Sequence, residues 1–290
     1  MSSKPRYVRE QRTICGERYQ ELDLFWVTDR EHRAGPRAKK HKASSQAQMQ
    51  ANAQRCKRRL VQLINRNFDE RGFHCVLTYD DEHLPEDEGR AARDVTNYLR
   101  RLKDRMRREG MDEKDLKWLC VTEYQNADPL QGLKEVRFHH HLLIQSDKLD
   151  REGRKELREM LEDCWAVGRG DERETLGTVN ADKLQPEQNG LQALANYLCK
   201  YPKRKKRWRA SRGLRQPEYQ RPNDTKWTKK RLADACTLCV DDAEWWEKKF
   251  PGWRLLGAEP YFDEERAEWR LYARFYRKPK KVELLKPLNL

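Results

Sequence analysis

The sequence predicts an α+β fold, with a central antiparallel β-sheet of about five strands and helices packed on it. Short runs of apolar and β-branched residues recur through the middle of the 290-residue chain, as expected of strands. Amphipathic segments with a helical period separate several of these runs. In chain order the segments read strand, helix, strand, strand, helix, strand and helix, and this order implies an antiparallel sheet with flanking helices.

Four segments carry the strand pattern. They cover residues 73–79, 118–124, 136–145 and 178–184. The first ends at the sequence DDEHLPEDEG, where Pro, Gly and Asp favour a turn. A loop over residues 126–135 joins the second segment to the third. We therefore expect these two strands to lie next to each other in the sheet.

Three segments carry the helix pattern. In residues 91–109 one apolar stripe, with cations elsewhere, is formed by Val95, Tyr98, Leu99, Leu102 and Met106. Residues 150–165 are also amphipathic and end in a glycine turn. Residues 191–201 are the third predicted helix, which Pro202 should end.

The chain is expected to have three parts. Residues 1–55 are polar and basic, and we expect them to be partly disordered or helical. Residues 56–217 hold the strands and helices described above and form the main domain. Residues 218–290 are expected to form a C-terminal α/β accessory region. Its predicted elements are a helix within 227–250 and strands at 253–258 and 269–276.

The charge of the chain points to a polyanionic partner. Lysine and arginine number 62 against 48 acidic residues, giving a formal net charge of +14 and a pI near 9.4. Such an excess most often serves nucleic-acid binding, although a basic protein with no such partner is the simpler alternative. The cations also cluster, with six of them between Arg100 and Arg108 and the run KRKKRWR at 203–209.

Other classes of protein are disfavoured. No stretch approaches the roughly 20 apolar residues of a membrane span, and the first residues, MSSKPRYVRE, contain no apolar signal core. Eight cysteines are scattered along the chain, as in a cytoplasmic protein with reduced thiols. Cys236 and Cys239 form a lone CxxC, whereas structural zinc requires four ligands. We expect a cytoplasmic protein with no membrane partner.

The sequence RFHHHLLI begins at Arg137 and runs from a polar start into an apolar strand. Side chains alternate faces along a strand, so His139 and His141 should share one face and His140 the other. Two imidazoles with the nearby carboxylate of Glu123 make a set that holds a divalent ion and leaves positions open for phosphate and water. The alternative is a polar patch at the start of a strand.

A second group of residues lies on the helix at 191–201. Tyr197, Lys200 and Tyr201 are spaced three and four residues apart, so they share a face of a helix. A tyrosine with an ordinary pKa of about 10 needs a cation or metal to act as a nucleophile, and Lys200 is one candidate. Alone, this spacing is equally typical of packing tyrosines beside a solvated lysine.

Several motifs occur together in an order known from one protein family. They are FHCVLTY at 73–79, EY at 123–124 followed by RFHHH at 137–141, WAVG at 165–168, YLCKYPKR at 197–204 and SRGL at 211–214. In this combination they resemble the motifs of HUH endonucleases of the rolling-circle replication initiator (Rep) type, encoded by small single-stranded-DNA phages, prophages and plasmids. The resemblance implies the HUH endonuclease fold.

The resemblance also implies an activity and the residues that perform it. Mg²⁺ or Mn²⁺ would be held by His139, His141 and Glu123. Tyr197 would attack a phosphate of single-stranded or extruded origin DNA, forming a 5′-phosphotyrosine and a free 3′-OH for rolling-circle replication, and a later attack would rejoin the strands. Lys200 would assist, and Tyr201 is either a second nucleophile or an auxiliary group.

DNA-binding residues and partners follow from the same resemblance and from the basic, tryptophan-containing segment after Pro202. The candidates are Arg137, Lys203, Arg204, Lys205, Lys206, Arg207, Trp208, Arg209 and Arg212. The sequence contains no Gly-Lys-Ser/Thr phosphate loop, so a helicase and a DNA polymerase of the bacterial host cell are expected partners.

Two alternatives stay open. A two-tyrosine HUH transposase uses the spacing seen between Tyr197 and Tyr201, although such enzymes are usually longer and carry a zinc module. A non-catalytic basic nucleic-acid-binding protein would have the same charge. A covalent protein–DNA adduct distinguishes both enzymes from the binding protein.

Overall fold

The computed structural model describes most of the chain. The described residues are 6–28, 46–128, 130, 132–168, 170–186, 190–198 and 208–278. The chain divides into two compact units. The central unit comprises residues 67–187 and 191–215, and the terminal unit comprises residues 1–66, 188–190 and 216–290.

A five-stranded antiparallel sheet forms the centre of the central unit, so the predicted α+β class is confirmed. Its strand order is β8-β3-β5-β4-β9, with β3 Phe73–Thr78, β4 Lys117–Gln125, β5 Val136–Gln145, β8 Val179–Lys183 and β9 Arg209–Ala210. The helices are α3 Glu88–Arg108, α4 Arg151–Asp163 and α5 Gln192–Tyr197. Strands β4 and β5 are neighbours, as the connecting loop predicts.

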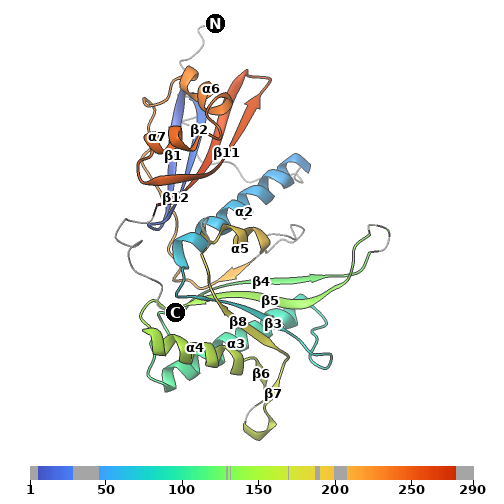
Figure 1. The fold of residues 1–290 in the computed structure, drawn as a ribbon. Coiled ribbons are helices and arrows are strands. Elements are labelled where there is room, and N and C mark those ends of the chain that lie inside the picture. The colour runs from blue at the N-terminus through green and yellow to red at the C-terminus, as the bar shows by residue number, and fades with distance from the viewer. Residues whose placement is uncertain are drawn as a thin grey trace. The chain divides into compact units, whose positions relative to one another are not determined.

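One face of this sheet is covered by α3 and α4 (Figure 1). The buried core on that side combines strand residues such as Cys75 and Leu142 with Leu102 of α3 and Leu157 of α4. The apolar stripe predicted for residues 91–109 is buried here. Because side chains alternate along a strand, the neighbours of Leu142 in β5, including His141, project from the opposite face of the sheet.

A small hairpin follows α4. Strand β6, Ala166–Val167, pairs with β7, Glu174–Thr175, and the short 3₁₀ helix η2, Gly170–Glu172, lies between them. Gly168 has a φ of +77°, and a Cβ there would lie 2.1 Å from the carbonyl oxygen of Glu172. Only glycine fits this turn, which accounts for the glycine in the WAVG motif.

The terminal unit is built on a second five-stranded antiparallel sheet. Its order is β10-β1-β2-β12-β11, with β1 Arg6–Cys15, β2 Tyr19–Thr28, β10 Glu218–Tyr219, β11 Trp253–Asp263 and β12 Glu268–Arg277. The unit also holds nearly all of α2, Gln46–Asn67, together with α6, Lys229–Thr237, and α7, Ala243–Lys249. Trp227, Trp246 and Phe275 are buried in its core with Leu22 and Leu24.

The expectation of a disordered or helical N-terminal segment is wrong for residues 6–28, which form the paired strands β1 and β2. The strand alternation is hidden in the sequence because several buried positions are polar. Glu10, Thr13, Gln20 and Glu21 are all at most 3% exposed. A pattern search based on hydrophobicity therefore reads this segment as surface.

The C-terminal region also differs from the expected separate extension. Strand β12 pairs with β2, so residues from both ends of the chain build one sheet. The predicted helix within 227–250 is two helices, α6 and α7. The side chain of Asp242 accepts a hydrogen bond from the backbone N–H of Trp245 and begins α7 as an N-cap. Among the described residues, no helix is long and apolar enough to cross a membrane.

Candidate metal centre and tyrosine helix

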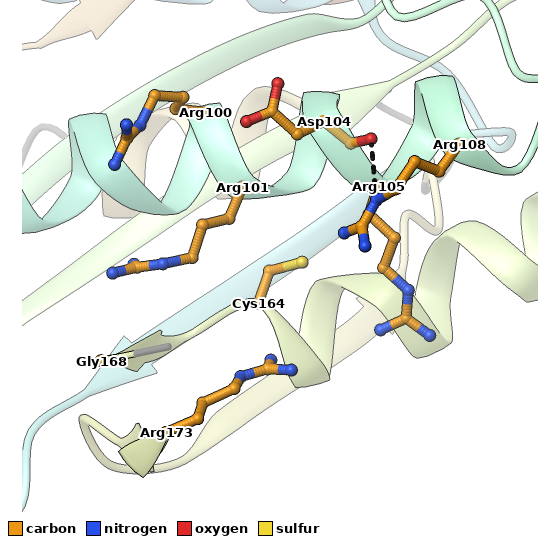
Figure 2. A pocket seen from close by; sticks show the side chains of 8 residues that line it. All are labelled: Arg100, Arg101, Asp104, Arg105, Arg108, Cys164, Gly168 and Arg173. Carbon is orange, nitrogen blue, oxygen red and sulfur yellow. Dashed lines mark hydrogen bonds between the residues drawn. The ribbon is translucent and has the colours of Figure 1, made fainter. Parts of the chain in front are cut away.

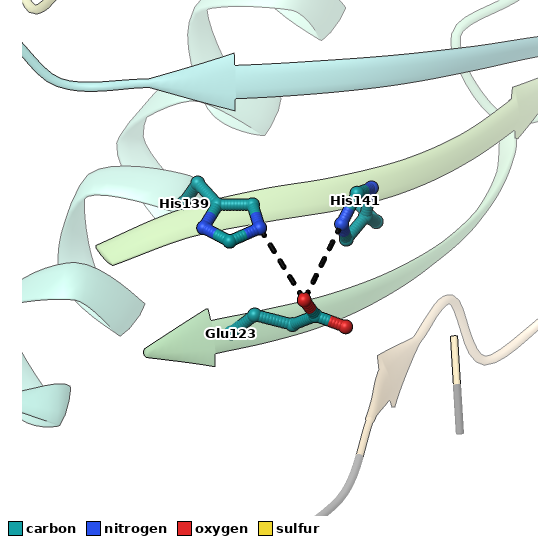
Figure 3. Close-up of side chains that lie close together, drawn as sticks. All are labelled: Glu123, His139 and His141. Atoms are coloured by element: carbon teal, nitrogen blue, oxygen red, sulfur yellow. Dashed lines mark ion pairs between the residues drawn. The ribbon is translucent and has the colours of Figure 1, made fainter. Parts of the chain in front are cut away.

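Glu123, His139 and His141 converge on one point of the central sheet (Figure 3). Glu123 of β4 lies directly opposite His139 of β5 in the antiparallel register. One carboxylate oxygen, Oε2, lies 3.4 Å from Nε2 of His139 and 3.8 Å from Nε2 of His141. Ligand atoms about 2.1 Å from an octahedral ion and at right angles are about 3 Å apart, so the three atoms need to move little to share an ion.

The charges of the centre suit a cation. Burial by itself raises the pKa of Glu123, but the hydrogen bonds from His139 and His141 outweigh it, and the net pKa falls to about 2. The carboxylate is thus ionised at any physiological pH. Its hydrogen bond to His139 raises the pKa of that imidazole. The Nδ1 of His139 lies 2.9 Å from the carbonyl oxygen of Arg137, which orients Nε2 toward Glu123.

His74 completes the centre, and the sequence did not mark it as a site residue. Its Nε2 lies 3.1 Å from Nδ1 of His141, with the two rings stacked. Burial, followed by the repulsion from His141, lowers the pKa of His74 to about 4, so this imidazole is neutral. A neutral His74 accepts the Nδ1 proton of His141 and leaves the lone pair of His141 on Nε2.

The residues fit a divalent ion by a test internal to the structure. His141 is 2% exposed, and its Nε2 is buried with no hydrogen-bond partner. A buried polar atom without a partner is costly. A cation on this nitrogen would remove the cost, and two imidazoles with a carboxylate suit Mg²⁺, Mn²⁺ and several transition metals.

His140 projects from the other face of the sheet. It is fully buried, with Nε2 2.9 Å from the hydroxyl of Tyr79 and Nδ1 2.9 Å from Oγ1 of Thr122. Burial lowers the pKa of His140 to about 3. The middle histidine is therefore a neutral part of the core beside α3 and α4, consistent with the alternation expected of the strand.

Tyr197 is the last residue of α5, and its ring stands edge-on to His141 with centroids 5.2 Å apart. Its side chain remains 43% exposed, so solvent and a large ligand can reach it. The other residues predicted for the tyrosine helix and its basic continuation lie outside the described residues. They are Lys200, Tyr201, Lys203, Arg204, Lys205, Lys206 and Arg207.

The remaining DNA-binding candidates are dispersed. Arg137 forms an ion pair of 2.8 Å with Asp81. Arg209 donates to the carbonyl oxygen of Ala92 and to Oγ1 of Thr96, at 2.7 and 2.8 Å, and so holds β9 against α3. Trp208 is half-buried and Arg212 is exposed.

Residues 72–206 match the family described as replication-associated protein of the ORF2 type. The matched segment is just under half of the chain and contains the metal centre, α3, α4 and Tyr197. No curated protein and no solved structure matches the chain. The family match supports a role in DNA replication.

Proposed function

We propose that this protein is a replication initiator that nicks single-stranded or extruded origin DNA by tyrosine transesterification. The observation that carries the proposal is the position of Tyr197. This exposed tyrosine contacts His141, a member of the only Glu–His–His cluster found among the described residues. A hydroxyl nucleophile beside a site for a divalent ion is the arrangement that phosphoryl transfer requires.

The reaction is an exchange of one phosphodiester bond for another. The phenolate oxygen of Tyr197 bonds to phosphorus as the bond to the 3′ oxygen breaks, and that oxygen takes up a proton. The products are a 5′-phosphotyrosine and a free 3′-OH, which a host polymerase extends. Attack of a 3′-OH on the phosphotyrosine later rejoins the strand.

The chain's residues would divide the work. Glu123, His139 and His141 would hold Mg²⁺ or Mn²⁺, which supplies electrostatic stabilisation to the reacting phosphate when bound. His74 would fix the ring of His141. Lys200 would stabilise the phenolate of Tyr197, since an adjacent cation favours the charged form of a tyrosine.

The test is a covalent adduct between the full-length protein and labelled single-stranded DNA carrying candidate origin sequences, with Mn²⁺ present. We expect a band that survives denaturation and disappears in Tyr197→Phe. Tyr219→Phe is the matched control, because Tyr219 is another exposed tyrosine and lies in the terminal unit. Loss of the adduct in Tyr201→Phe alone would transfer the nucleophile role to Tyr201. DNA binding with no adduct in the wild type would support the non-catalytic binding protein instead.

A further inference from the structure

A hollow of about 250 Å³ lies in the central unit between α3, the end of α4 and the β6–β7 hairpin (Figure 2). Five of the residues that line it are arginines, and one is acidic. They are Arg100, Arg101, Arg105, Arg108, Arg173 and Asp104. Figure 2 shows Arg101 extending from α3 and Arg173 extending from the hairpin side toward the same space.

Much of this positive charge is not compensated by carboxylates. Arg105 is paired with Asp163 at 2.5 Å, and Asp104 is paired with Arg107 at 3.1 Å. Among the described residues, no carboxylate forms an ion pair with Arg100, Arg101 or Arg108. Nε of Arg108 donates only to the backbone carbonyl of Asp104, at 3.4 Å. Arg173 likewise donates to the backbone carbonyl of Asp163.

The arginines also repel one another. Burial lowers the pKa of Arg101, and the charges of Arg100 and Arg173 lower it further. Arginine stays protonated in proteins, so the repulsion between these like charges persists at working pH. An anion in the hollow would remove it. Guanidinium groups bind phosphate oxygens through paired hydrogen bonds, which makes phosphate the anion that the lining recognises best.

The length of the arginine row favours a chain of phosphates over a single one. Arg100 and Arg108 are eight residues apart on α3, or about 12 Å along the helix axis. A DNA strand in a duplex carries one phosphate per about 3.4 Å of axis, so several consecutive phosphates match the row. The net charge of +14 and the match to a replication-associated family point to DNA as this polyanion.

We propose that the arginine hollow binds the phosphate backbone of DNA at a second site. Helices α3 and α4 cover one face of the central sheet, whereas Glu123, His139 and His141 project from the opposite face. The second site is therefore separate from the reacting phosphate. It holds flanking DNA without reading bases, because phosphate contacts carry no direct sequence information.

The experiment compares two charge-matched variants of the full chain in binding to single-stranded and duplex oligonucleotides. The test variant is Arg100→Gln/Arg101→Gln/Arg108→Gln. The control is Arg93→Gln/Lys114→Gln/Arg151→Gln, which removes three exposed cations of the same unit that do not line the hollow. Both are made in a Tyr197→Phe background with EDTA, so the result does not depend on nicking or on metal.

We expect the test variant to bind at least one form of DNA about tenfold or more weakly at low salt. The slope of log affinity against log salt should become shallower by about 2 to 3, for the loss of three phosphate contacts. The control should keep the greater part of the wild-type affinity and slope. Equal affinities and slopes in the two variants would overturn the proposal.

A second arm separates DNA from free phosphate and from misfolding. Inorganic phosphate is titrated during thermal unfolding. Stabilisation that vanishes in the test variant while DNA affinity is unchanged would assign the hollow to a small anion and overturn the DNA site. Arg100→Gln/Arg108→Gln changes only exposed side chains, and it should show the same direction of effect with an unchanged unfolding temperature. Failure of the adduct assay would leave this binding result intact.

Discussion

The ring of Tyr197 meets the imidazole of His141 edge-on, with the ring centroids 5.2 Å apart. His141 lies on β5 and Tyr197 on α5, more than fifty residues later in the chain. Only the path of the chain between them brings the predicted nucleophile to the predicted metal ligands. The contact joins the two groups of residues that the sequence marked separately.

Removal of the Tyr197 hydroxyl should separate chemistry from metal binding. Tyr197→Phe keeps the ring against His141 and removes only the oxygen. We expect it to bind Mn²⁺ with an affinity within about twofold of the wild type, less than 1.4 kcal/mol, while forming no adduct with DNA. Calorimetric titration of Mn²⁺ measures the first property. A large loss of metal affinity would make the tyrosine a ligand and weaken its role as nucleophile.

The ligand assignment predicts large losses of metal affinity. Glu123→Gln and His139→Asn should each weaken Mn²⁺ binding by about 100-fold or more, because loss of a direct ligand should exceed the about 10–100-fold effect of an outer residue. His83→Asn is a matched control, since His83 pairs with Asp80 at 2.8 Å and lies outside the cluster. Titration of both variants and the control with Mn²⁺ decides the assignment. Comparable affinities in all of them would disprove it.

His74 should act on the metal through His141. His74→Leu removes the acceptor for Nδ1 of His141 and should weaken Mn²⁺ binding by about 10–100-fold. His74→Gln retains an acceptor oxygen and should recover part of the loss. A structural role alone would lower the unfolding temperature without the difference between Gln and Leu in metal affinity, so both quantities are measured on both variants.

The hydrogen bond between His140 and Tyr79 should contribute to stability, not to metal binding. His140→Leu removes hydrogen bonds to Tyr79 and Thr122 in the core and should lower the free energy of unfolding by about 1–3 kcal/mol. Because the two residues interact, His140→Leu/Tyr79→Phe should cost less than the sum of the single variants. Urea unfolding of the four proteins measures this coupling. Strict additivity would show that the 2.9 Å contact contributes nothing.

Glu10 should make the stability of the terminal unit depend on pH. Burial by itself raises its pKa, but a 2.5 Å hydrogen bond from Trp227 and the charges of Arg12 and Lys226 outweigh it, and the net pKa is lowered. The folded state therefore binds the proton less readily than the unfolded state. This stabilisation is present above the ordinary glutamate pKa, about 4.3, and is lost as pH falls through the lower folded value.

The measurement for Glu10 is urea unfolding between about pH 3 and pH 7 of the wild type and Glu10→Gln, a range that spans the ordinary glutamate pKa. The wild type should lose stability on acidification more steeply than the variant, and the two curves should approach each other at the acid end. Glu264→Gln is the control, because Glu264 is exposed in the β11–β12 turn. Parallel curves for the wild type and Glu10→Gln would refute the assignment.

Local patterns were sufficient for the central unit. The alternation in β3, β4 and β5 and the apolar stripe of α3 are visible in the sequence because each element buries one face against a single core. The same alternation predicted that His139 and His141 share a face and that His140 does not. Adjacent strands joined by one loop were enough to bring Glu123 to them.

The sequence by itself thus determined the α+β class, the order of the central elements and the Glu123–His139–His141 set. Only the tertiary structure decided the pairing of β2 with β12, the packing of His74 on His141 and the gathering of Arg173 with the arginines of α3. These relationships join residues far apart in the chain, and local periodicity carries no information about such partners. The buried polar residues Glu10 and Glu21 add a second reason, since their burial depends on partners that only the folded chain supplies.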